Sequence, residues 1–166
     1  MLMLERLESM TVWSKRSTEN HQASLRGDCG TMERLIAEGT PRPERVDYGI
    51  GTHSVYTCSE ETLKKASEIS RDTGCTLSIH TSETREEVAD CHAEHGMYPI
   101  EYLDSIDYFT EGTVCAHCGW VTKKEMRILA GHHAHAVHCP VSNQKLACGG
   151  TMSCLLYTSP SPRDAT

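Results

Sequence analysis

The chain has 166 residues, enough for about one domain, and its 23 acidic side chains outnumber 16 basic ones, which gives a formal net charge of -7. This acidic balance argues against a protein that binds nucleic acid or an anionic membrane through its charge. No apolar run approaches the roughly 20 residues that a membrane-spanning helix needs, and the charged residues directly after Leu4 leave no signal-peptide core.

The first 45 residues carry the weakest pattern. Leu4, Leu7 and Met10 have the spacing of one helical face, and two prolines within residues 40–43 mark a loop. After this loop, stretches typical of strands alternate with stretches typical of helices, which indicates parallel β/α units. The predicted strands are 46–53, 76–80, 113–117 and 135–138, and the predicted helices are 59–71, 84–95, 100–106 and 122–131.

Start and stop signals support these helices. Ser59, Thr84 and Thr122 each stand where an N-cap is expected, because a hydroxyl oxygen there can accept a free backbone N–H of the first turn. Gly74 and Gly96 follow the first two helices, where a left-handed residue commonly ends a helix.

Histidines mark the ends of the predicted strands. The chain contains ten histidines, and all four strands finish on one: His53, His80, His117 and His138. A single histidine at such a place is more often an isolated core or surface residue. Four at matching positions are harder to explain in that way, because the carboxyl ends of parallel barrel strands meet at one mouth, where functional groups gather. We therefore expect the four rings to converge.

The segment from His80 to Glu83 combines an imidazole with a carboxylate. A neutral imidazole on a rigid strand end is a good ligand for Zn²⁺ or Fe²⁺. Glu83 follows the strand and can take a proton from a metal-bound water, and His117 can orient that water or stabilise developing charge. Glu83 could equally be an acidic residue that the dipole of the next helix favours.

Five segments in order along the chain resemble the amidohydrolase superfamily, in the branch of cytosine/adenosine deaminase-related hydrolases. These segments are THSVYTCSEETL, IHTSETREEV, HGMYPIEYLD, AHCGWVTKKEMRILA and HCPVSNQKLACGG. The resemblance implies a (β/α)8 barrel that holds one divalent metal, Zn²⁺ or Fe²⁺. It also implies hydrolytic deamination or dechlorination of a purine, pyrimidine or triazine-like ring, so the expected partner is a small heteroaromatic substrate.

The resemblance also implies roles for individual residues. His80 matches the metal ligand on the fifth strand of the family, Glu83 the general acid/base, and His117 the histidine beside the metal-bound water. The residues expected on the substrate side are His53, His138 and Asn143.

The chain departs from the family pattern in several places. No His-x-His precedes residue 46, Thr52 stands where the family commonly has proline, and the match ends soon after Gly150, before the family's last aspartate ligand. We therefore expect an α/β fold that is a partial (β/α)8 TIM-type barrel, roughly strands four to seven with their helices. Such a chain is expected to be inactive alone.

The last 13 residues do not fit the family. Residues 154–166 show no periodicity and resemble a translated sequencing adapter. The expected division is a partial hydrolase barrel over 1–153 and a non-native tail over 154–166.

Two other functions are compatible with parts of the sequence. A small structural zinc-binding module could use Cys115, Cys118, His138 and Cys139. Alternation along a strand argues against it, because Cys115 and Cys118 would point to opposite faces. A non-catalytic barrel that kept its pocket is the other alternative.

The nine cysteines are odd in number and irregularly spaced, which favours reduced thiols in the cytoplasm. We expect no nucleic acid or membrane partner, and a homo-oligomer for the full-length parent.

Overall fold

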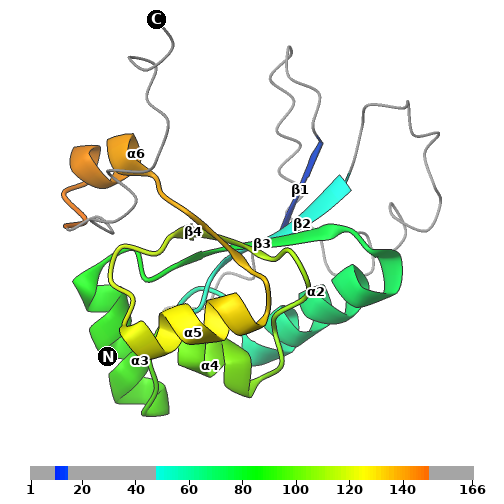
Figure 1. Ribbon diagram of the computed structural model, residues 1–166, viewed down its shortest axis with the longest axis horizontal. Coiled ribbons are helices and arrows are strands. Elements are labelled where there is room, and N and C mark those ends of the chain that lie inside the picture. The colour runs from blue at the N-terminus through cyan, green and yellow to red at the C-terminus, as the bar shows by residue number, and fades with distance from the viewer. Residues whose placement is uncertain (1–9, 15–47, 150–166) are drawn as a thin grey trace, which may run out of the picture.

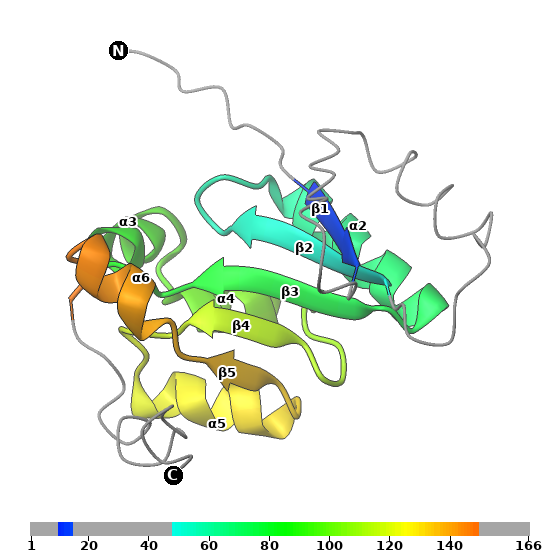
Figure 2. The same ribbon diagram turned by 90° about the horizontal axis from the view of Figure 1, so that it is seen from above.

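The computed structural model describes residues 10–14 and 48–149, which form one mixed sheet with helices (Figure 1). The strands lie in chain order across the sheet, and β2 to β5 are parallel, as predicted, while β1 runs antiparallel to β2 (Figure 2). Their bounds are β1 Met10–Ser14, β2 Tyr48–Ser54, β3 Thr76–Thr81, β4 Val114–His117 and β5 His135–Val137.

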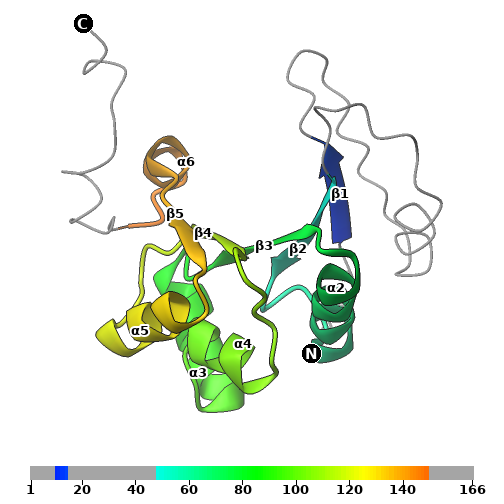
Figure 3. The same ribbon diagram turned by 45° about the vertical axis from the view of Figure 1, so that its right-hand side comes forward.

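Helices cover one face of this sheet. Figure 3 shows α2 to α5 on one side and the short α6 on the other. None of the helices in the described part of the chain has the length and apolar character that a membrane crossing requires. The helix bounds are α2 Glu60–Thr73, α3 Arg85–His95, α4 Pro99–Ser105, α5 Lys123–Gly131 and α6 Pro140–Lys145.

The helix ends follow the local signals in the sequence. Ser59 Oγ accepts the backbone N–H of Thr62 at 3.2 Å, and Thr84 Oγ1 accepts that of Glu87 at 3.0 Å. Gly74 ends α2 with φ of 69°, a left-handed conformation that costs glycine little because it has no Cβ. The predicted starts and ends of α2 and α3 are confirmed to within about two residues.

Other expectations need correction. Met10 begins strand β1 and does not belong to a helical face, and β1, which was not predicted, pairs with the outer edge of β2. Pairing of this kind is favourable because an open edge leaves backbone groups without partners. Strand β5 ends at Val137, one residue before His138, and α6 was not predicted. Leu4, Leu7, the tail 154–166 and the division at residue 153 lie outside the described residues.

The core lies between the sheet and helices α2 to α5, and it is mainly aliphatic. Its fully buried members include Ile50 and Leu77 from the strands and Leu63 and Leu103 from the helices. Burying each of these side chains contributes roughly 1.5–3 kcal/mol relative to leaving it in water. This packing fixes the sheet, and the sheet fixes where its strand ends lie.

Thr52 supports the core with a polar contact. Its hydroxyl lies 2.7 Å from the hydroxyl of Tyr108, which is fully buried, and both groups lie 3.4 Å from the carbonyl oxygen of Ser78 in β3. Thr52 therefore provides a hydrogen-bond partner for a phenol that has no access to water.

We predict that Thr52→Val lowers the free energy of unfolding by about 1–2 kcal/mol, because the buried Tyr108 hydroxyl keeps only the longer contact with Ser78. Urea denaturation measures this change. The matched control is Thr76→Val, at an exposed position of β3, which we expect to change stability by less than about 0.5 kcal/mol. Equal effects of the two substitutions would contradict the assignment.

Candidate functional site

Three imidazole rings form a row at the carboxyl ends of β2, β3 and β4. The ring centroids of His53 and His80 are 5.4 Å apart, and those of His80 and His117 are 5.3 Å apart. The parallel register brings the three histidines within one residue of each other across the sheet, because His80 pairs with Ser54, next to His53, and Thr81, next to His80, pairs with His117. The predicted convergence is thus observed for three of the four histidines. His138 follows β5 directly, and both of its ring nitrogens are buried without a hydrogen-bond partner in the structure.

The protonated nitrogen of His80 is fixed by the backbone. Its Nδ1 lies 2.8 Å from the carbonyl oxygen of His53. A carbonyl oxygen can only accept, so Nδ1 carries a hydrogen and, in the neutral ring, Nε2 keeps its lone pair. This is the arrangement that a metal-binding histidine adopts when its other nitrogen donates to a carbonyl.

His117 has the same tautomer for a different reason. Its Nδ1 donates to Oδ1 of Asn143 in α6 at 2.7 Å, and Oε1 of Glu83 lies 3.5 Å from the same nitrogen. The side chain of His117 is 7% exposed and that of Glu83 is 20% exposed, so this contact is largely shielded from water. The Nε2 atom of His117 therefore also keeps its lone pair.

The backbone at His117 is strained. Its φ is 72°, and the N–H of Cys118 donates to the carbonyl oxygen of Ala116 at 3.1 Å. These two features describe a γ-turn with positive φ, which is rare and costs energy for a residue with a side chain. Such strain persists only where the surroundings hold it, and it collects at functional sites.

A buried carboxylate holds the turn that carries Glu83. Glu87 is 5% exposed, and its two oxygens accept the backbone N–H groups of Ser82 at 2.9 Å and Glu83 at 2.8 Å. Burial raises the pKa of Glu87, and hydrogen bonds from the backbone of Glu83, Ser82 and Thr84 oppose that rise. Sequence reasoning missed Glu87. The spacing Thr84-x-x-Glu87, which is typical of a capping box, was the available signal.

Backbone hydrogen bonds join the loops after β3 and β4. The N–H of Cys118 donates to the carbonyl oxygen of Thr81 at 3.0 Å, and the N–H of Trp120 donates to that of Ser82 at 3.1 Å. These bonds continue the ladder beyond the strands, so the turns that carry Glu83 and His117 are held side by side.

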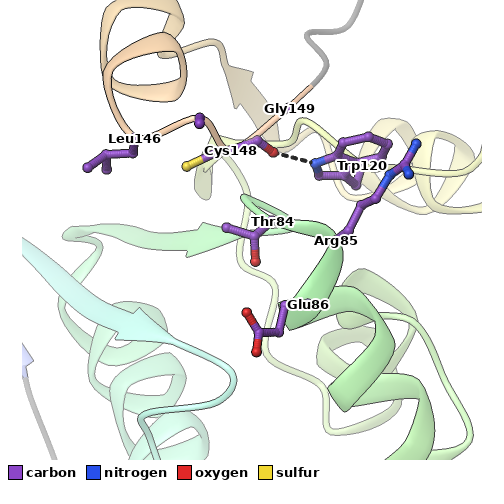
Figure 4. A pocket seen from close by; sticks show the side chains of 8 residues that line it. Thr84, Arg85, Glu86, Trp120, Leu146, Cys148 and Gly149 are labelled. Carbon is purple, nitrogen blue, oxygen red and sulfur yellow. Dashed lines mark hydrogen bonds between the residues drawn. The ribbon is translucent and has the colours of Figure 1, made fainter.

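The segment after α6 contacts Glu83 through Cys148. The same segment borders a pocket of about 570 Å³, which Thr84, Arg85 and Trp120 also line (Figure 4). Cys148 Sγ donates to Glu83 Oε1 at 3.4 Å, and Trp120 Nε1 donates to the carbonyl oxygen of Cys148 at 2.8 Å. The guanidinium of Arg85 lies 4.3 Å from the centre of the Trp120 ring. Gly149 lies so close to this ring that a Cβ atom there would clash with it.

His53 lies at one end of the row and, like His80, is exposed, whereas His117 is buried. The Nδ1 atom of His53 contacts the Thr57 hydroxyl at 2.7 Å. Partial burial lowers the pKa of His53, the neighbouring His80 lowers it further, and Glu83 raises it. A neutral ring at the open side of the row suits a contact with an uncharged substrate.

Several buried polar atoms at this edge of the sheet have no hydrogen-bond partner in the structure. Unsatisfied buried polar groups are costly, so they gather where a protein contacts a ligand or solvent. They are Thr81 Oγ1, Ser82 Oγ, Asn143 Nδ2 and both ring nitrogens of His138.

The donor chemistry fits a divalent metal, but the number of donors does not. His80 presents a free Nε2, as a first ligand should. Over residues 10–14 and 48–149, however, no three or more His, Cys, Asp or Glu side chains come together in a way that could hold a metal ion, whereas a zinc site needs three protein ligands or more. A site at His80 therefore requires donors from beyond these residues.

The alternative zinc module gains no support. Cys115 and Cys118 are both fully buried, and the thiol of Cys118 donates to the carbonyl oxygen of Cys115 at 3.4 Å. Among the described residues, no three or more His, Cys, Asp or Glu side chains are placed so that they could hold a metal ion, and this includes Cys115, Cys118, His138 and Cys139.

Comparisons with known proteins agree with the geometry. Residues 3–152 match the model of the amidohydrolase family. The 5'-deoxyadenosine deaminase of Methanothrix thermoacetophila is 47% identical over 100 residues, which are 60% of this chain and 24% of that protein. The 5-methylthioadenosine/S-adenosylhomocysteine deaminase of Aquifex aeolicus is 41% identical over 116 residues, 70% of this chain and 27% of its own length. The chain thus spans about a quarter of these curated relatives.

The fold has counterparts among solved structures. An adenosine deaminase from Xanthomonas campestris, solved with bound zinc, superposes with a TM-score of 0.70 at 26% identity, over 78% of this chain and 29% of that one. Guanine deaminase from C. acetobutylicum, solved with guanine in its active site, gives 0.56 at 27% identity, over 60% and 24% of the two chains.

We predict that Asn143→Ala weakens the preference of His117 for the Nδ1–H tautomer, because the 2.7 Å acceptor is lost and only Glu83 Oε1, 3.5 Å away, remains near this nitrogen. Nitrogen NMR of the imidazole rings measures the tautomers. His80 is the internal control, since its acceptor is the His53 carbonyl. The exposed neighbour Gln144 supplies the control variant Gln144→Ala. An unchanged His117 tautomer in Asn143→Ala would contradict the assignment.

Proposed function

Because the chain belongs to the amidohydrolase family, we propose that it supplies part of the active site of a metal-dependent aminohydrolase. The reaction is hydrolytic deamination, or dechlorination, of a purine, pyrimidine or triazine-like ring, and an adenosine-type ring is the favoured substrate. The observation that carries the proposal is the contact of Glu83 with His117, 3.5 Å apart, next to His80, whose ring centroid lies 5.3 Å from that of His117.

Each of these side chains has a separate task. His80 is a metal ligand, and the remaining ligands come from residues beyond the described ones. The cation, Zn²⁺ or Fe²⁺ by donor type, supplies the charge that makes a water molecule acidic near neutral pH. Glu83 accepts the proton of the attacking water and passes it to the leaving amino group. His117 accepts a hydrogen bond from the water at Nε2 and so orients it.

The substrate contacts come from three further side chains. His53 stands at the exposed end of the row, while His138 and Asn143 hold buried nitrogens without hydrogen-bond partners in the structure. A heteroaromatic ring carries both ring-nitrogen acceptors and an amino donor, so it can satisfy such groups. This match supports a small, flat, polar substrate.

The free thiols and the net charge support a proposal for the cellular compartment and the partners of the enzyme. The seven cysteines in the described part of the chain are free thiols, in keeping with a reducing compartment such as the cytoplasm. The net charge of -7 disfavours nucleic acid and anionic membranes as partners. We propose that the complete enzyme is a homo-oligomer.

We predict that Glu83→Gln in the complete enzyme lowers kcat by about 10²–10⁴-fold and leaves the metal content unchanged, because the proton carrier alone is lost. His80→Ala should instead lose the metal. Adenosine deamination and elemental analysis measure the two effects. The control is Glu86→Gln, at an exposed position of α3. A normal kcat for Glu83→Gln would refute the role of Glu83.

We also predict that the 166-residue chain alone binds less than one metal ion per chain and does not deaminate adenosine. The reason is that His80 lacks partner ligands in the described residues. Purified chain is tested with zinc by elemental analysis and with adenosine and triazine substrates. One bound metal together with measurable turnover would show that the chain, or a second copy, supplies the other ligands.

A further inference from the structure

We propose that Glu87 is a positioning residue for Glu83: its buried carboxylate fixes the turn that aims the proton-transfer group at His117. Glu87 acts through the backbone and does not touch the reacting atoms. The inference rests on the proposed function, since it assigns Glu87 a task only if Glu83 carries the proton.

The hydrogen bonds of Glu87 are unusual for a residue in the first turn of a helix. A capping-box carboxylate ordinarily binds the N–H of its own N-cap residue. The Glu87 oxygens also reach farther back, to the N–H groups of Ser82 at 2.9 Å and Glu83 at 2.8 Å. The two oxygens thus hold two successive peptide groups of the catalytic turn.

The turn needs this support because it is strained. Ser82 has φ of 52°, and its own side-chain hydroxyl has no hydrogen-bond partner in the structure. On the opposite side, the carbonyl oxygen of Ser82 accepts the N–H of Trp120 at 3.1 Å. The turn is therefore held between a carboxylate and the backbone of the neighbouring loop.

A comparison of Glu87 with Glu125 distinguishes the positioning of Glu83 from ordinary helix capping. Glu125 is also a buried carboxylate in the first turn of a helix, and it accepts two backbone N–H groups, from Thr122 at 2.8 Å and from Ile100 at 3.2 Å. Its bonds join the starts of α5 and α4, not a turn that carries a site residue. Loss of either carboxylate should cost stability, but only loss of Glu87 should displace Glu83.

Two substitutions of Glu87 should displace Glu83, because each removes part of the pair of hydrogen bonds to the backbone of Ser82 and Glu83. In Glu87→Gln one oxygen becomes an amide NH₂ group, which cannot accept the second backbone N–H. In Glu87→Asp the charge remains, but the side chain is one methylene shorter and cannot reach both groups. A shift of about 1 Å in a catalytic group can lower the rate by as much as about 10²-fold.

The test uses the complete enzyme and compares Glu87→Gln, Glu87→Asp and the control Glu125→Gln. We expect Glu87→Gln to lower kcat by about 10–100-fold and to leave KM and the metal content unchanged. We expect Glu87→Asp to lower kcat as well. Glu125→Gln should lower the melting temperature but not kcat. Hydrogen exchange of the peptide that contains Ser82 and Glu83 should become faster in both Glu87 variants and stay unchanged in Glu125→Gln.

A double variant distinguishes positioning from a general loss of structure. In the Glu83→Gln background, Glu87→Gln should lower kcat no further, because the group that it positions is gone. An unchanged kcat in the single Glu87 variants, an equal loss in Glu125→Gln, or an additive loss in the double variant would each overturn the inference. A normal kcat for Glu83→Gln would overturn the proposed function as well. If Glu87→Gln does not fold, Glu87→Asp decides by the same criteria.

Discussion

The parallel, in-register pairing of β3 with β4 is the constraint on which the site depends. Parallel neighbours lie about 4.8 Å apart and end at the same edge of the sheet, so residues at matching ends must meet. His80 and His117 stand one residue apart in this register, since His117 pairs with Thr81, and their ring centroids lie 5.3 Å apart. Two backbone hydrogen bonds, from Cys118 to Thr81 and from Trp120 to Ser82, extend the same order into the loops. The backbone ladder thus brings together the turns that carry Glu83 and His117, and side-chain contacts such as those of Glu87 hold them there.

Much of the fold was predictable because its signals are local. A cap such as Ser59 or Thr84 depends on atoms within one turn of the chain, and the structure confirms both. The alternation of strands and helices fixed the parallel order of β2 to β5. That order in turn placed the rings of His53, His80 and His117 in one row.

The rest depends on contacts between residues far apart in sequence, and local patterns do not encode these. The antiparallel partner of β2 is one example. The bond between His117 and Asn143, 26 residues apart, is another, although both residues had been selected for the site. The role of Glu87 is not predictable from its spacing, which indicates only a bond to Thr84, whereas its two oxygens also accept the N–H groups of Ser82 and Glu83. The γ-turn at His117 has no sequence signal at all, since the residue is not glycine.

The pairing of β1 with β2 has a consequence for barrel closure. A strand has two edges, and in this structure β3 occupies one edge of β2 while β1 occupies the other. A closed barrel of parallel strands requires that second edge for a parallel neighbour. The antiparallel pairing and closure are therefore mutually exclusive, and they compete for the same backbone groups. Closing the ring would require strand exchange, in which an incoming parallel strand displaces residues Met10–Ser14 from β2.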